Sequence, residues 1–209
     1  MRDRLEKQLE TGLAKLDLSL SPKQIGDLVS FVLLLEKWNR SFNLTSVQNP
    51  EEMISRHVLD SLAIAPHLQG NTFADVGSGP GIPGIPLAEV FPERHFTLID
   101  SRGKRSAFQR QAVITLGLKN VSVLNIRAED YQGEPFQGII SRAFASLADF
   151  DRLCCAMGSD DTLFYAMKGK VSEEEKAVLQ ERIVSVSALN VPGTDAARSL
   201  VVFRYNSKT

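Results

Sequence analysis

Three glycines alternate in one short segment of the chain, Asp75-Val-Gly-Ser-Gly-Pro-Gly81. The segment follows a run of strand-forming residues, 73–76, and precedes a predicted helix that begins near Pro83. Glycines in such a strand-to-helix turn let the backbone bend tightly and approach a ligand without a Cβ in the way. A turn that binds a dinucleotide would also carry glycine at position 82, where this chain has isoleucine. The segment therefore predicts close contact with a cofactor and weakens the case for a nicotinamide dinucleotide.

Acidic and small residues follow the next two predicted strands. Asp100 ends the second strand, and its carboxylate can accept both hydrogen bonds of a ribose diol. Ala128 and Glu129 follow the third strand. Because the carboxyl ends of parallel strands line one crevice, these positions and the glycine turn together predict a site for a nucleotide-type cofactor. The glycines alone would fit an ordinary tight connection equally well.

The elements that must position these residues are short apolar runs alternating with amphipathic stretches from Thr72 onward, the pattern of a parallel sheet covered by helices. A helix is predicted over residues 103–116, with Gly117 as its C-terminal stop. The last two β-rich runs are joined by a turn-forming segment, which predicts a hairpin. The predicted strands cover residues 73–76, 95–100, 121–126, 138–141, 162–167, 183–189 and 200–205.

The first 68 residues have a different pattern, which predicts helices throughout. Ser21 and Pro22 are typical of an N-cap and a first-turn proline, and apolar residues then recur at helical spacing up to Trp38. A weaker apolar stripe precedes this helix, and another helical segment begins at Pro50. We therefore expect an N-terminal helical extension packed on the core, residues 1–68, and a main domain, residues 69–209.

Four longer motifs make the pattern specific. They are EKWNRSFNLT (36–45), RHVLDS (56–61), DVGSGPGIPGIP (75–86) and ISRAFAS (140–146). The glycine segment resembles motif I of Rossmann-like methyltransferases that use S-adenosylmethionine. Together, and in this order, the four motifs resemble the glucose-inhibited division protein B family, the bacterial methyltransferase G of small-subunit ribosomal RNA.

The resemblance implies a fold and a reaction. The fold is α/β, a Rossmann-like class I methyltransferase domain with a seven-stranded, mostly parallel sheet and an antiparallel C-terminal hairpin, plus the helical extension. The reaction transfers a methyl group from S-adenosylmethionine to N7 of one guanine in 16S ribosomal RNA. The positively charged sulfonium of this cofactor would be attracted to the nearby carboxylate of Asp75. The cofactor contacts carried over by motif fall on Gly77, Ile82, Ala128, Glu129 and Arg142, and the turn and strand-end geometry adds Gly79, Gly81 and Asp100.

The residues after the fourth strand agree with methylation at N7. This atom carries a free lone pair, so the enzyme must mainly align the reacting atoms and needs no general base. Methyltransferases of exocyclic amines carry Asp or Asn, two prolines and an aromatic residue here, whereas this chain reads Ser141-Arg-Ala-Phe144. Arg142 is the candidate catalytic residue and could reach the cofactor, a phosphate or the O6 edge of a guanine. Phe144 could stack on a base or belong to the core.

Neither a metal site nor a nucleophilic cysteine is expected. The three histidines lie on unrelated segments without partners at metal-ligand spacing. His57 belongs to a cluster with Arg56 and Asp60, which could cap a helix or line the mouth of the cofactor site. Cys154 and Cys155 lie on a mostly apolar, helical stretch, which favours packing over catalysis.

RNA binding must come from a local patch, because 24 basic and 25 acidic residues leave a net charge of −1. The candidate RNA-binding residues follow two strand ends and, with Arg142, could form a basic rim around one crevice. A solvated helix face explains the basic residues between 102 and 110 about as well. The candidates are Arg102, Lys104, Arg105 and Lys168.

The modest basic content favours a folded small-subunit particle, rather than naked RNA, as the form in which 16S rRNA is recognised. The adjacent cysteines indicate a reducing compartment, and residues 1–30 lack a continuous apolar stretch, so we expect a cytoplasmic protein without a membrane segment. We also expect a monomer, although no sequence pattern encodes the oligomeric state. Two alternatives stay open at this point, a methyltransferase of small molecules and a regulatory module that only binds S-adenosylmethionine.

Overall fold

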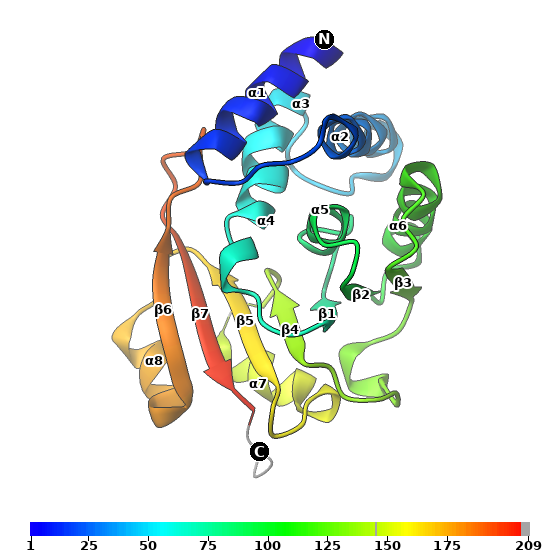
Figure 1. Cartoon of the computed structure of the whole chain (residues 1–209). Helices are drawn as coiled ribbons and strands as arrows, with labels where there is room; N and C mark the ends of the chain where they lie inside the picture. The colour runs from blue at the N-terminus through cyan, green and yellow to red at the C-terminus, as the bar shows by residue number, and fades with distance from the viewer. Residues whose placement is uncertain (145, 206–209) are drawn as a thin grey trace.

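The structure is a computed structural model that describes residues 1–144 and 146–205. It contains a seven-stranded sheet with the order β3-β2-β1-β4-β5-β7-β6 (Figure 1). The first five strands are parallel, whereas β7 runs antiparallel to both β5 and β6. The predicted sheet with its C-terminal hairpin is confirmed. The strands are β1 (Thr72–Val76), β2 (His95–Ile99), β3 (Val121–Leu124), β4 (Gly138–Ser141), β5 (Leu163–Lys168), β6 (Ile183–Leu189) and β7 (Arg198–Arg204).

Helices connect the strands and form the N-terminal part, as the sequence predicts. The α-helices are α1 (Arg2–Lys15), α2 (Pro22–Phe42), α3 (Pro50–Met53), α4 (Asp60–Leu62), α5 (Gly84–Val90), α6 (Gly103–Leu116), α7 (Leu147–Cys154) and α8 (Glu173–Leu179). A π-helical turn, η1 (Ile54–Leu59), joins α3 to α4. Short 3-10 turns are η2 (Ala65–His67), η3 (Ala128–Asp130), η4 (Cys155–Met157) and η5 (Gln180–Arg182). None of the helices described is both long and apolar enough to cross a membrane.

Local signals set the ends of the longer helices. Ser21 and Gln24 form a reciprocal capping box at the start of α2, and Asn43 ends that helix in the left-handed conformation. Gly117 ends α6 with a φ of +67°. Strand ends differ slightly from the prediction: β2 stops at Ile99, so Asp100 is the first residue of the following loop.

The two faces of the sheet bury separate hydrophobic clusters, because side chains alternate along each strand. Phe73 of β1 belongs to the cluster under α5, α6 and the N-terminal helices, whereas its neighbour Ala74 belongs to the cluster under α7 and α8. Figure 1 shows these two groups of helices on opposite faces of the sheet.

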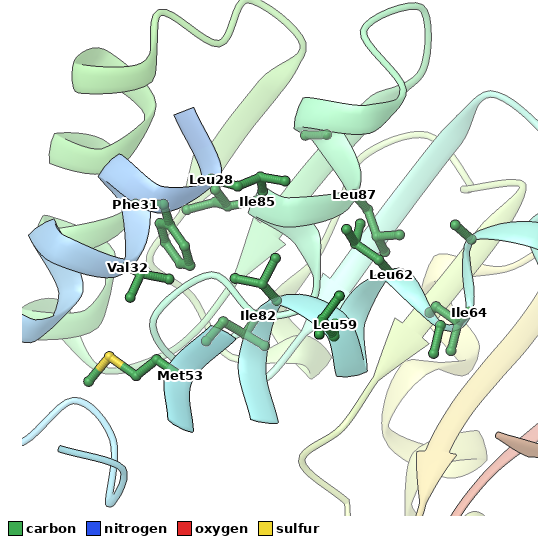
Figure 2. Close-up of a cluster of buried hydrophobic side chains, with 14 of the residues drawn as sticks. Leu28, Phe31, Val32, Met53, Leu59, Leu62, Ile64, Ile82, Ile85 and Leu87 are labelled. Carbon is green, nitrogen blue, oxygen red and sulfur yellow. The ribbon is translucent and has the colours of Figure 1, made fainter. Parts of the chain in front are cut away.

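The N-terminal helices share the first of these clusters with the glycine segment. Figure 2 shows Leu28, Phe31 and Val32 of α2 close to Ile82 and Ile85. The N-terminal residues thus pack directly on the turn that follows β1. The division of the chain at residue 68 stays a prediction, and Ala145 of the fourth motif and residues 206–209 lie outside the described residues.

Candidate functional site

The glycine turn follows β1 with three residues in the left-handed region, where φ is +68° at Gly77, +57° at Gly79 and +85° at Gly81. Their surroundings differ. A Cβ on Gly77 would lie 2.6 Å from the Cβ of Ala143, and a Cβ on Gly81 would collide with Ile85. A Cβ on Gly79 would have nothing nearer than a backbone oxygen at 4.0 Å. Gly79 is therefore the position where the turn leaves space.

Asp100 holds the turn in place from the end of β2. Its Oδ2 accepts hydrogen bonds from the Gly79 backbone N–H (3.0 Å) and from Arg105 (3.0 Å), and its Oδ1 accepts one from the Arg102 N–H (2.8 Å). A carboxylate offers about four lone-pair positions. One position is left for a ligand hydroxyl, and Arg105 would have to move before Asp100 could accept both hydrogen bonds of a ribose diol.

A cavity of about 220 Å³, the glycine-turn cavity, opens beside these residues. It brings together four of the predicted cofactor contacts, Gly77, Asp100, Ala128 and Glu129, with apolar walls between them. Phe144 lines this cavity and also stacks on Phe150, so its two predicted roles are compatible. The remaining lining residues are Val76, Ile99, Ser101, Arg102, Arg105, Ile126, Arg127 and Leu153.

Two other predicted cofactor contacts point into the protein. Ile82 is 3% exposed, and its side chain lies in the cluster of Figure 2. The Cα of Gly81 faces Ile85 and Leu98. Neither residue lines the glycine-turn cavity, so a contact with a cofactor would have to come from the backbone. Both residues face inward because the turn also covers the hydrophobic cluster that contains Ile85 and Leu98.

Asp75 lies beneath the turn and is fully buried. Its Oδ2 accepts a hydrogen bond from the Gly84 N–H at 2.8 Å, whereas its Oδ1 has no partner among the described residues. Burial raises the pKa of this carboxyl to about 7. Asp75 does not line the glycine-turn cavity, so its effect on a positively charged ligand would have to act through the turn.

A second cavity of about 320 Å³, the basic cavity, lies between the N-terminal helices and the sheet. The N-terminal part contributes Thr45, Ser46, Val47, Arg56, His57 and Asp60 to its wall, and the strand ends contribute Arg142, Met167, Lys168, Gly169 and Arg198. The N-terminal extension thus forms one wall of this cavity.

The predicted basic rim is divided by the fold. Arg102 and Arg105 lie at the glycine-turn cavity, whereas Arg142 and Lys168 lie at the basic cavity. The ammonium group of Lys104 is 5.9 Å from the ring centroid of Phe42 and lines neither cavity. The expectation of one crevice that all these residues surround is therefore wrong for the described structure.

His57 fixes the loop that borders the basic cavity. Its Nδ1 lies 3.0 Å from the carbonyl oxygen of Arg56, which can only accept, so Nδ1 carries the proton. Its Nε2 then accepts a hydrogen bond from the Thr45 hydroxyl at 2.9 Å, and that hydroxyl accepts one from the Val47 N–H at 3.2 Å. Burial and the nearby charge of Arg142 lower the pKa of His57 to about 4, so the ring is neutral near pH 7.

Sequence reasoning grouped Asp60 with Arg56 and His57 but gave it no arginine partner, and it missed Arg198. Asp60 is 1% exposed and accepts hydrogen bonds from both Arg142 and Arg198. Asp60 stands within the motif at 56–61, which was a usable signal. Nothing local marks Arg198, because the residue that explains it lies 138 positions earlier.

Cys154 is fully buried in the cluster under α7, and burial raises the pKa of its thiol. A buried thiol of raised pKa is a poor nucleophile, which supports the packing role. The described residues contain no group of three His, Cys, Asp or Glu side chains placed to hold a metal ion.

Comparison with known proteins identifies the family. A family model, GidB, described as rRNA small subunit methyltransferase G, matches residues 24–201. The chain belongs to this family. It is 46% identical over 200 residues to the ribosomal RNA small subunit methyltransferase G of Shewanella amazonensis, covering 94% of this chain and 97% of that protein. It is 50% identical over 192 residues to that of Shigella flexneri, covering 90% and 93%.

Solved structures share the fold of this family member at low sequence identity. A SAM dependent methyltransferase from Aquifex aeolicus matches with a TM-score of 0.59 and 17% identity, over 77% of this chain and 97% of that one. P. horikoshii TYW2 in complex with MeSAdo matches with a TM-score of 0.54 and 15% identity, over 71% of this chain and 62% of that one. The expected class I methyltransferase fold is confirmed.

Proposed function

We propose that this chain transfers a methyl group from S-adenosylmethionine to N7 of one guanine in 16S ribosomal RNA. Membership of the rRNA small subunit methyltransferase G family, over residues 24–201, is the observation that carries the proposal. The two cavities support it, because one has the lining that a nucleoside needs and the other is rich in basic groups.

The glycine-turn cavity fits the adenosine part of the cofactor. Gly79 does not line this cavity, but it lies two residues after Gly77, which does, and a Cβ at Gly79 would meet no atom nearer than 4.0 Å. Ile99 and Ile126 offer apolar walls to a flat ring, and Asp100 has one lone-pair position for a ribose hydroxyl. We assign the cofactor contacts to Gly77, Gly79, Asp100, Ala128 and Glu129, with Gly81 and Ile82 acting through their backbone.

The residues present suit a reaction without proton abstraction. When bound, S-adenosylmethionine supplies a methyl group on a positively charged sulfur. Guanine N7 can take up this methyl group directly, because its lone pair is free. The chain must then orient the two partners and exclude competing groups. Arg142 lies where it can contact substrate or cofactor, at the end of β4 and in the wall of the basic cavity. His57 is neutral and hydrogen-bonded through both ring nitrogens, so we give it a structural role.

The substrate form is part of the proposal. We infer that the chain acts as a cytoplasmic monomer on 16S rRNA within a small-subunit particle. The net charge of −1 supports the particle as the substrate, because weak attraction to arbitrary RNA favours recognition of a folded particle. If a short RNA hairpin were methylated as efficiently as the particle, this part of the proposal would fail.

The test is nucleoside mapping by mass spectrometry. Purified protein is incubated with labelled S-adenosylmethionine and small-subunit particles from cells that lack the activity. We expect labelled 7-methylguanosine at one site of 16S rRNA. Arg142→Ala should lower this methylation at least tenfold and should affect methylation far more than thermal stability, because Asp60 keeps Arg198 as one of its two partners.

Two results would contradict the proposal. Methylation of a small molecule but not of the particle would favour a small-molecule methyltransferase. Binding of the cofactor without transfer to any ribosomal RNA would favour a regulatory module. If Arg142→Ala lost stability and activity in parallel, the arginine would be structural.

A further inference from the structure

Asp60 lies buried between two arginines from distant parts of the chain. Its Oδ2 accepts a hydrogen bond from Nη1 of Arg142 at 2.8 Å, and its Oδ1 accepts one from Nε of Arg198 at 2.9 Å. The Asp60 side chain is 1% exposed, whereas those of Arg142 and Arg198 are 30% and 26% exposed. All three residues line the basic cavity, so the two guanidinium groups face solvent while the carboxylate behind them does not.

Each of the two guanidinium groups has N–H donors that no described residue uses. Nη1 of Arg142 also donates to the carbonyl oxygen of Arg56 at 3.0 Å, and Nη1 of Arg198 donates to that of Ala197 at 3.1 Å. No described residue accepts from Nη2 of either arginine. Planar forks of this kind bind phosphate oxygens well, and Asp60 offsets the repulsion that would otherwise separate them.

Other charges around the basic cavity are already paired or absent. Lys168 forms an ion pair with Glu175 at 2.7 Å, and Arg56 forms one with Glu52 at 3.3 Å. His57 is neutral near pH 7. The single carboxylate of Asp60 leaves one net positive charge on its two arginines, so the excess positive charge of the cavity is concentrated there.

We propose that Asp60 is a positioning residue that holds Arg142 and Arg198 as one pair, and that this pair binds a phosphate group of the substrate RNA. The inference rests on the proposed function and adds a phosphate site with Arg198 as its second ligand. The π-helical turn η1 leads directly into Asp60, and turns of this kind occur frequently at functional sites.

The test measures binding rather than turnover. Dissociation constants for small-subunit particles lacking the modification are measured with S-adenosylhomocysteine present, at several KCl concentrations. We expect Arg198→Ala and Asp60→Asn each to weaken binding on the order of tenfold to hundredfold. Each should also make the slope of log Kd against log [KCl] shallower by about one, because one phosphate contact is lost.

Asp151→Asn is the matched control. Asp151 is 8% exposed as a side chain and is paired with Arg182 through both carboxylate oxygens, on the α7 side of the sheet. Its loss should lower stability while leaving the particle affinity and the salt slope unchanged. The double variant of Asp60 and Arg198 should bind no more weakly than about the weaker single variant, because both changes break the same contact.

Three results would overturn the inference. One is an unchanged salt slope in Arg198→Ala, which tests the phosphate contact even if Asp60→Asn fails to fold. Another is Asp60→Asn behaving like Asp151→Asn. The third is Arg198→Ala losing affinity for S-adenosylmethionine with unchanged particle affinity, which would assign the pair to the carboxylate of the cofactor. Failure of the wild-type chain to bind particles would instead refute the proposed function.

Discussion

The glycine turn allows a prediction in which backbone strain and ligand contact are separated. Gly79 and Gly117 have similar left-handed backbones, with φ of +57° and +67°. Neither has an atom nearer than 4.0 Å to the position of an added Cβ. Gly117 ends α6, whereas Gly79 lies in the glycine turn, two residues after Gly77 in the wall of the proposed cofactor site. Alanine at either position should therefore cost about the same stability, but only one should affect binding of the cofactor.

The magnitudes follow from the backbone and the available space. A non-glycine residue in this region costs roughly 1–2 kcal/mol, so Gly79→Ala and Gly117→Ala should lower the free energy of unfolding by that amount. A methyl group placed against a bound ligand adds roughly 1–3 kcal/mol of overpacking. Gly79→Ala should therefore weaken binding of S-adenosylmethionine about fivefold to 150-fold, and Gly117→Ala should leave it unchanged.

Gly77→Ala extends the series. Its Cβ would lie 2.6 Å from that of Ala143, closer than carbon atoms can approach without movement. The clash should add roughly 1–3 kcal/mol to the cost of the backbone strain. This variant should therefore be less stable than the other two and should also lose affinity, since Ala143 adjoins Arg142 in the loop after β4.

Urea unfolding and isothermal titration calorimetry with S-adenosylmethionine measure the two quantities on the same samples. Equal affinities of Gly79→Ala and Gly117→Ala would refute the reasoning, because the open side of Gly79 would then not face the ligand. This includes the case in which both variants lose the same affinity for S-adenosylmethionine, since backbone strain alone would account for it.

The remaining predictions concern buried titratable groups. The pKa of Asp75 is raised to about 7, so the folded state holds a proton that the unfolded chain releases above about pH 4, and stability is lost as the pH rises from about 4 to 7. Asp75→Asn should remove up to about 4 kcal/mol of this loss, seen in urea unfolding at pH 4 and 8; an identical pH dependence in both proteins would contradict the burial argument. The pKa of His57 is lowered to about 4, so stability is lost as the pH falls from about 6.5 to 4, and His57→Gln should show up to about 3 kcal/mol less of that loss in the same assay. A variant as acid-sensitive as the wild type would mean that the ring is charged in the folded state. Cys154→Ala should cost about 1 kcal/mol of stability, measured by thermal unfolding, and leave methyl transfer unchanged; a tenfold loss of transfer would restore a catalytic role for the thiol.

Predictions from the sequence succeeded where the cause is local. The capping box of Ser21 and Gln24 and the left-handed Gly117 end helices through contacts within a few residues. The apolar run at 73–76 predicted β1, which the structure shows over Thr72–Val76. Gly77 and Asp100 meet at one cavity because parallel strands end at one edge, which is a property of the fold class.

Packing competes with the motif at several of the predicted site residues. Ile82 belongs to the glycine segment, yet its side chain fills the core against the N-terminal helices. The carboxylate of Asp100 is largely occupied by the turn and by α6, because a buried acid must satisfy its oxygens within the protein. The basic residues divide between two cavities, since helix α6 directs Lys104 toward Phe42.

The sequence by itself determined the order of the helices and strands, the glycine turn, and the family to which the four motifs belong. Only the tertiary structure decided that β7 lies between β5 and β6 and that the N-terminal helices complete the basic cavity. It also decided the contact of Asp60 with Arg198, across 138 positions. The physical reason is that a buried carboxylate needs hydrogen-bond partners, and tertiary packing, rather than any local pattern, determines which distant strand supplies them.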